Sequence, residues 1–137
     1  MNRRKVLNGM GMAVAAAAFG RTTAARSATQ WRDWPKGSSP TEIGKRVAQR
    51  FVATAHTNFG RPTPPRSITY PETCTWYGAL TFARLTKDAA LTKQLIARFE
   101  PLFGPKANLI PTADHVDPSV FGAVPFELYI QTKDPRY

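Results

Sequence analysis

Residues 80–91 read LTFARLTKDAAL, and residues 126–137 read FELYIQTKDPRY. In both stretches an apolar, helix-forming segment runs into Thr-Lys-Asp, and a new helix start follows. A repeat that is two helices long is typical of stacked helical hairpins. Such hairpins cannot bury their apolar faces alone, and about three or more are usually needed. We therefore expect an all-α protein whose chain breaks off within a domain. A self-contained four-helix unit is the alternative.

Caps and apolar spacing predict four helices. The first begins at Pro40 behind Ser39, because a hydroxyl N-cap followed by proline is a strong helix start. The second runs from about Glu72 to Leu85, and the third from about Ala89 to Phe99 behind Asp88 as its cap. Prolines and glycines mark residues 58–66 and 104–115 as loops.

The fourth helix is expected to begin at Asp117-Pro118, again a cap followed by proline. Gly122 and Pro125 should weaken or kink its first turns. No stretch of the chain alternates strictly enough to demand a strand.

The amino terminus has the pattern of an export signal. Asn2-Arg3-Arg4-Lys5 is followed by uncharged residues from Val6 to Gly20 and by small residues around Ala24–Ala28. A basic segment, a short apolar segment and a small-residue exit predict a signal peptide over residues 1–28. The Arg3-Arg4 pair indicates the twin-arginine route, with an ordinary Sec signal as the alternative. Residues 29–38 then form a linker, and we expect a periplasmic or extracellular protein that meets the membrane only transiently during export.

The charge and the cysteine count exclude several classes of protein. The net charge is +10, but half of it lies in residues 1–28, and the remaining basic residues form no stripe with aromatics. We therefore expect no nucleic-acid partner. One cysteine and two separated histidines support neither a disulfide framework nor a metal site, and nothing indicates a cofactor. Cys74 itself reads as a small buried residue.

Residues 70–137 resemble a known enzyme family. The matching residues are Trp76-Tyr77-Gly78-Ala79-Leu80, Leu85-Thr86-Lys87-Asp88, and the run from His115 to Tyr129 continued by Gln131-Thr132-Lys133-Asp134-Pro135-Arg136-Tyr137. These residues are similar to the amino-terminal hairpins of the glycoside hydrolase family 88/105 group, the unsaturated glucuronyl and unsaturated rhamnogalacturonyl hydrolases. Lys133 stands where the family usually has glycine. The resemblance implies that residues 39–137 are the amino-terminal part of an (α/α)6 toroid.

The resemblance also implies a chemistry and a substrate. Family members hydrate the double bond of a 4,5-unsaturated uronic acid at the non-reducing end of pectin-derived oligosaccharides. This needs a carboxylic acid to protonate the alkene and a base to activate water, which one aspartate can do if a second tunes it. Asp117 matches the first of the family's two aspartates, the supporting one. The second, the proton donor, has no match here, so we expect this chain alone to be inactive.

Other residues are candidates for substrate binding. The His115 side chain would contact the substrate, although a loop histidine satisfied by the backbone is equally expected. The rings of Trp76 and Tyr77 would stack on a sugar, or else belong to the core between helices. The Arg84 guanidinium would pair with a uronate carboxylate, although its place near a helix end favours the surface. Asp117 itself is also a plain N-cap candidate.

Two other classes of protein fit the same pattern of helices. A different (α/α)6 enzyme, such as an epimerase or a polysaccharide lyase, would share the hairpins but need other residues in place of Asp117 and His115. A non-catalytic, exported helical binding module would be complete in itself. The sequence leaves the exact oligosaccharide and the oligomeric state open.

Overall fold

The computed structural model describes residues 33–137. The chain divides into two units, Met1–Trp34 and Pro35–Tyr137, and the second contains every helix described below. The predicted signal peptide, residues 1–28, lies outside the described residues, as do residues 29–32 of the predicted linker. Residues 33–39 precede the first helix without regular structure, and Gly37 has a φ of 83° in the turn there.

Helices account for all the regular structure between residues 33 and 137. In chain order they are α2 (Pro40–Ala53), α3 (Tyr70–Thr86), α4 (Ala89–Phe99), η1 (Glu100–Phe103), η2 (Ala107–Leu109), α5 (Val116–Ser119), η3 (Val120–Gly122) and α6 (Ala123–Thr132). No β-strand occurs in this range, and one isolated bridge pairs Asn58 with Arg61. The expectation of an all-α protein is confirmed for this part of the chain.

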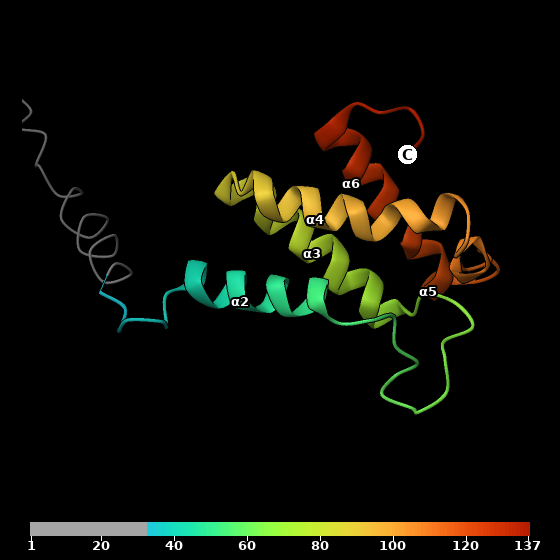
Figure 1. Cartoon of the computed structure of the whole chain (residues 1–137), viewed down its shortest axis with the longest axis horizontal. Coiled ribbons are helices and arrows are strands. Elements are labelled where there is room, and N and C mark those ends of the chain that lie inside the picture. Colours follow the sequence, from blue (N-terminus) through green and yellow to red (C-terminus); the bar gives the residue numbers. More distant parts are fainter. Residues whose placement is uncertain (1–32) are drawn as a thin grey trace, which may run out of the picture. The chain divides into compact units, whose positions relative to one another are not determined.

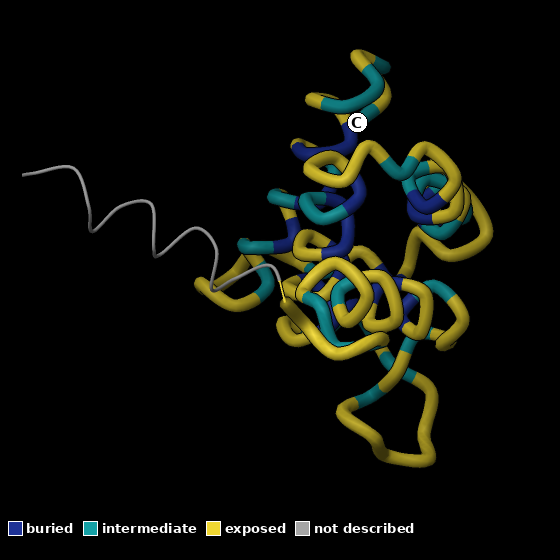
Figure 2. The backbone as a smooth tube through the Cα atoms, turned by 90° about the vertical axis from the view of Figure 1, so that its left-hand side faces the viewer, coloured by how far each residue is buried: buried dark blue, intermediate teal, exposed yellow. Residues whose placement is uncertain are grey.

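Helix α3 lies at the centre of the second unit and contacts α2, α4 and α6. Figure 1 shows α2 and α3 running in opposite directions, with α4 returning alongside α3. Figure 2 shows buried segments where these helices face one another, whereas the loop between α2 and α3 is mostly exposed until it reaches the buried Ile68. The fully buried side chains come from four segments: Trp76, Leu80, Leu95, Leu102, Val124 and Leu128.

Helices α2 and α3 approach closely at Gly44. A Cβ atom added there would lie 2.5 Å from Cε2 of the Phe82 ring. This distance is shorter than carbon atoms tolerate, so the missing side chain of Gly44 is what admits the ring.

Two of the predicted helix starts are confirmed at the level of single hydrogen bonds. Ser39 and Glu42 form a capping box, in which each side chain bonds the backbone N–H of the other residue. The Asp88 carboxylate accepts the N–H of Leu91 at 3.0 Å. It also lies 3.0 Å from the Lys45 ammonium of α2, so it caps α4 and links α2 to the start of α4.

The Thr-Lys-Asp repeat is also a structural repeat. Lys87 ends α3 and Lys133 ends α6, and both have left-handed backbones with φ of 55° and 61°. In each copy the threonine hydroxyl donates to the carbonyl four residues back, Thr86 to Phe82 and Thr132 to Leu128, at 2.8 Å. A left-handed residue at a helix end is the position that glycine favours, which explains why a glycine suits the place that Lys133 occupies.

The fourth predicted helix differs from its prediction. It begins two residues earlier, at Val116 instead of Pro118, so that His115 and not Asp117 is the N-cap, and Asp117 lies in the first turn. It is also not one α-helix, because the 3-10 segment η3 separates α5 from α6. Gly122 ends η3, and Pro125 lies in the first turn of α6, where its missing N–H costs least. The expectation that the early turns of this helix are weak or kinked is confirmed.

Some apolar side chains on α6 are exposed. Phe126, Tyr129 and Ile130 lie at helical spacing on one face, with exposed fractions of 63%, 42% and 37%. The opposite face of α6 carries the buried residues Val124, Glu127 and Leu128. Helix α6 is therefore apolar on two faces, only one of which packs against the other described helices.

Candidate functional site

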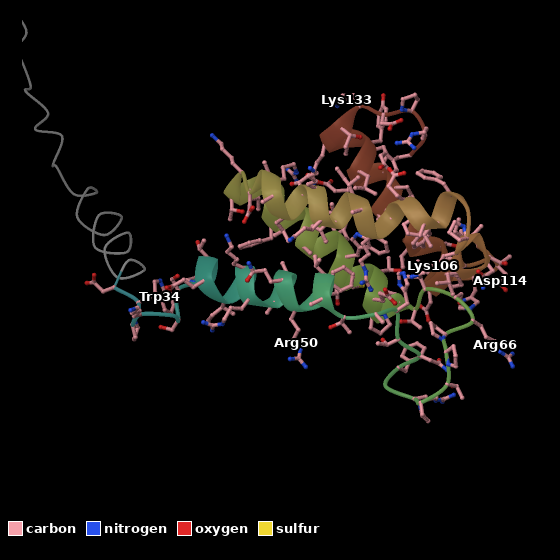
Figure 3. All side chains as sticks on the ribbon, viewed as in Figure 1. Trp34, Arg50, Arg66, Lys106, Asp114 and Lys133 are labelled. Atoms are coloured by element: carbon pink, nitrogen blue, oxygen red, sulfur yellow. The ribbon has the colours of Figure 1, made fainter. Side chains whose placement is uncertain are left out.

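An open pocket of about 470 Å³ lies at the end of the bundle where α3 and α5 begin. The backbone N–H of Ile68 donates to the carbonyl of Leu109 at 2.8 Å, which ties the loop before α3 to the segment before α5. Figure 3 shows Arg66 and Asp114 at this end of the bundle. The polar residues that line the pocket are Arg66, Ser67, Thr69, Tyr70, Asn108, Thr112, Asp114, His115 and Asp117. We call it the Asp117 pocket.

The two residues singled out most strongly from the sequence share this pocket. Asp117 is exposed in the first turn of α5, and His115 precedes that helix with an extended backbone. The carbonyl of His115 accepts the Ser119 hydroxyl at 2.7 Å, so the backbone there is fixed. The His115 ring is exposed, and its Nε2 lies 3.8 Å from an Asp114 oxygen. Its side chain remains available to a ligand.

Sequence reasoning missed two residues that the fold brings to the Asp117 pocket. Tyr70, the first residue of α3, lines the pocket. The pKa of its hydroxyl is raised, first by a hydrogen bond with Cys74 and further by the nearby Asp117 carboxylate. Arg66 supplies a cation from the loop. Neither stands out in the sequence, because each joins this pocket only through the pairing of two segments that are far apart along the chain.

The structure separates the two aromatic candidates. Trp76 has no exposed surface, and its ring lies 5.8 Å from that of Phe51 and 5.6 Å from that of Phe99. It therefore belongs to the core, so the expectation that it stacks on a sugar is wrong for this structure. Tyr77 is 43% exposed on α3 but does not line the Asp117 pocket. It follows Tyr70 on the same face of α3, about 10 Å farther along the helix.

Cys74 also differs from its prediction, because it is exposed. It lies one turn after Tyr70 on the outer face of α3, and it borders an apolar groove of about 490 Å³ between α2 and α3. Its neighbours Thr73 and Trp76 face the core instead.

Arg84 forms an ion pair with another residue of the protein. Its Nε donates to a Glu127 oxygen at 2.8 Å. Glu127 is buried, and Gln131 donates to the same oxygen at 2.9 Å. The guanidinium therefore compensates a buried carboxylate between α3 and α6, which leaves no reason to assign it to a uronate.

A second buried network ties α3 and α4 to the end of α2. Glu72 Oε1 lies 2.6 Å from His56 Nδ1 and 2.7 Å from Arg98 Nη2. The Arg98 guanidinium lies 4.4 Å from the centroid of the Phe51 ring. Burial raises the pKa of Glu72, but the hydrogen bonds and charges of His56 and Arg98 outweigh it, so that its pKa is lowered overall. No role for His56 was predicted from the sequence, and its hydrogen bond to Glu72 shows a structural one.

Other kinds of site are not apparent in the described residues. Between residues 33 and 137, no three His, Cys, Asp or Glu side chains are placed to hold one metal ion. Within the same residues, no helix combines the length and apolar character needed to cross a bilayer. Comparisons with protein-family models, curated proteins and solved structures found no match to this chain.

Proposed function

We propose that the chain is the amino-terminal part of an exported glycoside hydrolase of the unsaturated uronyl type, and that the Asp117 pocket binds its sugar. One observation carries the proposal: Asp117 and His115, chosen from the sequence, line one open pocket. The groups around them are those that a polyol needs, since carboxylates and an imidazole accept from sugar hydroxyls while an amide and hydroxyls donate to them.

The pocket also suits the charge of a uronic acid. Arg66 is the cation among its lining residues, and a guanidinium pairs with a carboxylate through two parallel hydrogen bonds. Tyr70 adds an exposed aromatic ring, the kind of surface on which a pyranose stacks. In this assignment Arg66 takes the role first considered for Arg84, and Tyr70 the role first considered for Trp76.

The finer architecture is likewise proposed as an (α/α)6 toroid. Two features support it: the repeated helix ends at Lys87 and Lys133, and the exposed apolar face of α6. In a ring of hairpins each hairpin covers the face of its neighbour, and such a face is what α6 presents.

The expected role of this chain is binding and not turnover. Asp114 and Asp117 are the carboxylates of the pocket, and both are exposed. A general acid is usually kept protonated by apolar surroundings, which neither has. These features favour the binding module as the second candidate function, with the same ligand chemistry. An epimerase or polysaccharide lyase has no observation in its favour.

Calorimetry with an unsaturated galacturonyl disaccharide tests the proposal. We expect saturable binding to the full chain, weakened about tenfold in Asp117→Asn, since one charge-assisted hydrogen bond contributes about 1.5–3 kcal/mol. Glu42→Gln, which changes an exposed carboxylate of the α2 capping box, is the matched control and should bind normally. Loss of the ultraviolet absorbance of the conjugated uronate reports turnover, and we expect none. Equal binding by the wild type and Asp117→Asn would contradict the site, and turnover by this chain would contradict the missing proton donor.

A further inference from the structure

Phe59 has an unusual backbone conformation at the edge of the Asp117 pocket. Its φ is 49° and that of Gly60 is 73°, so both central residues of the turn from Asn58 to Arg61 are left-handed. The N–H of Arg61 donates to the carbonyl of Asn58 at 2.9 Å and closes the turn. Turns of this kind favour asparagine or glycine where Phe59 stands, and a bulky residue there is strained. Strain of this kind is found most often at binding and active sites.

The Phe59 side chain is not held in this place by burial. It is 64% exposed, and it lines the Asp117 pocket together with Tyr70, His115 and Asp117. No ring contact within residues 33–137 includes it. Figure 1 shows the loop that carries it, between α2 and α3, extending beyond the ends of these two helices. The ring therefore adds little to the core, and its exposed surface is available to a ligand.

Phe59 also borders a second opening, of about 180 Å³, between the end of α2 and the start of α3. Both Phe59 and Thr69 line this opening and the Asp117 pocket. Its charged residues, Glu72 and Arg98, pair with each other at 2.7 Å, so the polar side-chain groups that remain for a ligand are hydroxyls. These belong to Thr54, Thr57, Thr69 and Thr75. We call it the threonine opening.

Two of these hydroxyls, those of Thr57 and Thr69, make no hydrogen bond within residues 33–137. A hydroxyl can donate one hydrogen bond and accept two, which matches the hydroxyls of a sugar. The chemistry of the threonine opening is therefore that of a second sugar site, with no free cation of the kind that Arg66 supplies to the Asp117 pocket.

We propose that Phe59 stands between two sugar sites: the Asp117 pocket holds the uronic acid, and the threonine opening holds the next sugar unit of the same oligosaccharide. A ligand that reaches from one opening into the other passes the Phe59 ring or the Thr69 side chain, which line both. A pyranose stacks its apolar face on an aromatic ring. Phe59 thereby favours a ligand of two or more units over a single uronic acid. The inference rests on the proposed function, because it takes the Asp117 pocket as a sugar site.

Calorimetry on the full chain with two ligands tests the inference. One is the unsaturated galacturonyl disaccharide, and the other is the methyl glycoside of unsaturated galacturonic acid, which lacks a second sugar. We expect the disaccharide to bind more tightly. Phe59→Asn should weaken binding of the disaccharide about fivefold and that of the methyl glycoside much less, whereas Asp117→Asn should weaken both. Phe59→Tyr keeps the ring and should bind like the wild type.

Thermal unfolding separates a binding role of Phe59 from a structural one. Asparagine tolerates a left-handed backbone better than phenylalanine, so Phe59→Asn should keep or raise the Tm while it weakens binding. A purely structural residue would lower both. Phe126→Asn is the matched control for the loss of an exposed ring, because Phe126 is 63% exposed and lies outside both openings. It should bind the disaccharide like the wild type.

The possible failures of this inference and of the sugar site are distinguishable. Equal affinity of the wild type for the two ligands would overturn the inference. So would equal losses in Phe59→Asn and Phe126→Asn, a Phe59→Asn loss that is the same for both ligands, or one that comes with a lower Tm. Binding that Asp117→Asn weakens and Phe59→Asn leaves unchanged would overturn this inference alone. A wild-type chain that binds neither ligand would overturn the proposed function as well.

Discussion

Replacing Glu72 by glutamine tests whether its buried network with His56 and Arg98 holds α3 and α4 to the end of α2. Glu72 is 7% exposed, and its Oε1 is shared by His56 and Arg98. Its second oxygen, Oε2, is buried with no partner within residues 33–137. In Glu72→Gln the Arg98 charge loses its counter-ion, and the new amide N–H group has no acceptor ready for it. Removing one partner of a buried ion pair typically costs about 3–5 kcal/mol.

We expect Glu72→Gln to lower the free energy of unfolding by about 3 kcal/mol, the low end of that range, because glutamine still offers one oxygen to Arg98. For a unit of this size, about 1 kcal/mol shifts the midpoint by roughly 4–8 °C, so Tm should fall by roughly 12 °C or more. Differential scanning calorimetry and urea titration measure both quantities. Glu100→Gln is the control, because Glu100 pairs with Arg136 at the surface and should lose less than about 1 kcal/mol. Equal losses in the two variants would refute the reasoning.

Three further predictions concern stability. Because folding lowers the pKa of Glu72, the ionised carboxylate stabilises the folded state above pH 4.5, the ordinary pKa, and this stabilisation is lost as the pH falls through the lower pKa of the folded state. As the pH is lowered below 4.5, the urea midpoint should therefore fall less steeply in Glu72→Gln than in the wild type. Lys87→Gly should stabilise the protein by about 0.5–1 kcal/mol, because it removes a lysine from a left-handed backbone conformation. The control Lys93→Gly, within α4, should destabilise the protein by about 1 kcal/mol. A Lys87→Gly variant less stable than Lys93→Gly would show that the turn at Lys87 is unstrained. Gly44→Ala should destabilise, because overpacking against Phe82 costs about 1–3 kcal/mol and exceeds the helix-propensity gain of about 1 kcal/mol; a raised Tm would contradict the close approach.

The parts of the fold that follow from local chemistry could be predicted from the sequence. The starts of α2 and α4 depend on Ser39 and Asp88, whose side chains bond backbone groups only three residues away. Such caps are visible in any sequence. The predicted start of α5 lies two residues too late, because Asp117 before Pro118 has the same cap signature without forming the cap.

The sites could be predicted only in part, because they depend on contacts between distant segments. Asp117 and His115 are neighbours in the chain, so their shared pocket follows once either is chosen. The approach of Tyr70 to Asp117, and of His56 and Arg98 to Glu72, depends on how the loop after α2 folds back. The sequence left Trp76 open between the core and a sugar site, and the prediction that Cys74 is buried was wrong because it relied on residue type. Helical spacing from Trp76, Leu80 and Ala83 places Cys74 on the opposite face of α3, which is exposed.

We propose above all that the Asp117 pocket recognises an unsaturated uronyl sugar. A titration of the isotope-labelled full chain with unsaturated galacturonyl disaccharide, followed by amide chemical shifts, tests it most directly. We expect saturable shifts that are largest for the pocket residues Tyr70, Asp114, His115 and Asp117, and about tenfold more disaccharide should be needed to saturate them in Asp117→Asn. Shifts confined to other surfaces, or a titration that Asp117→Asn leaves unchanged, would contradict it.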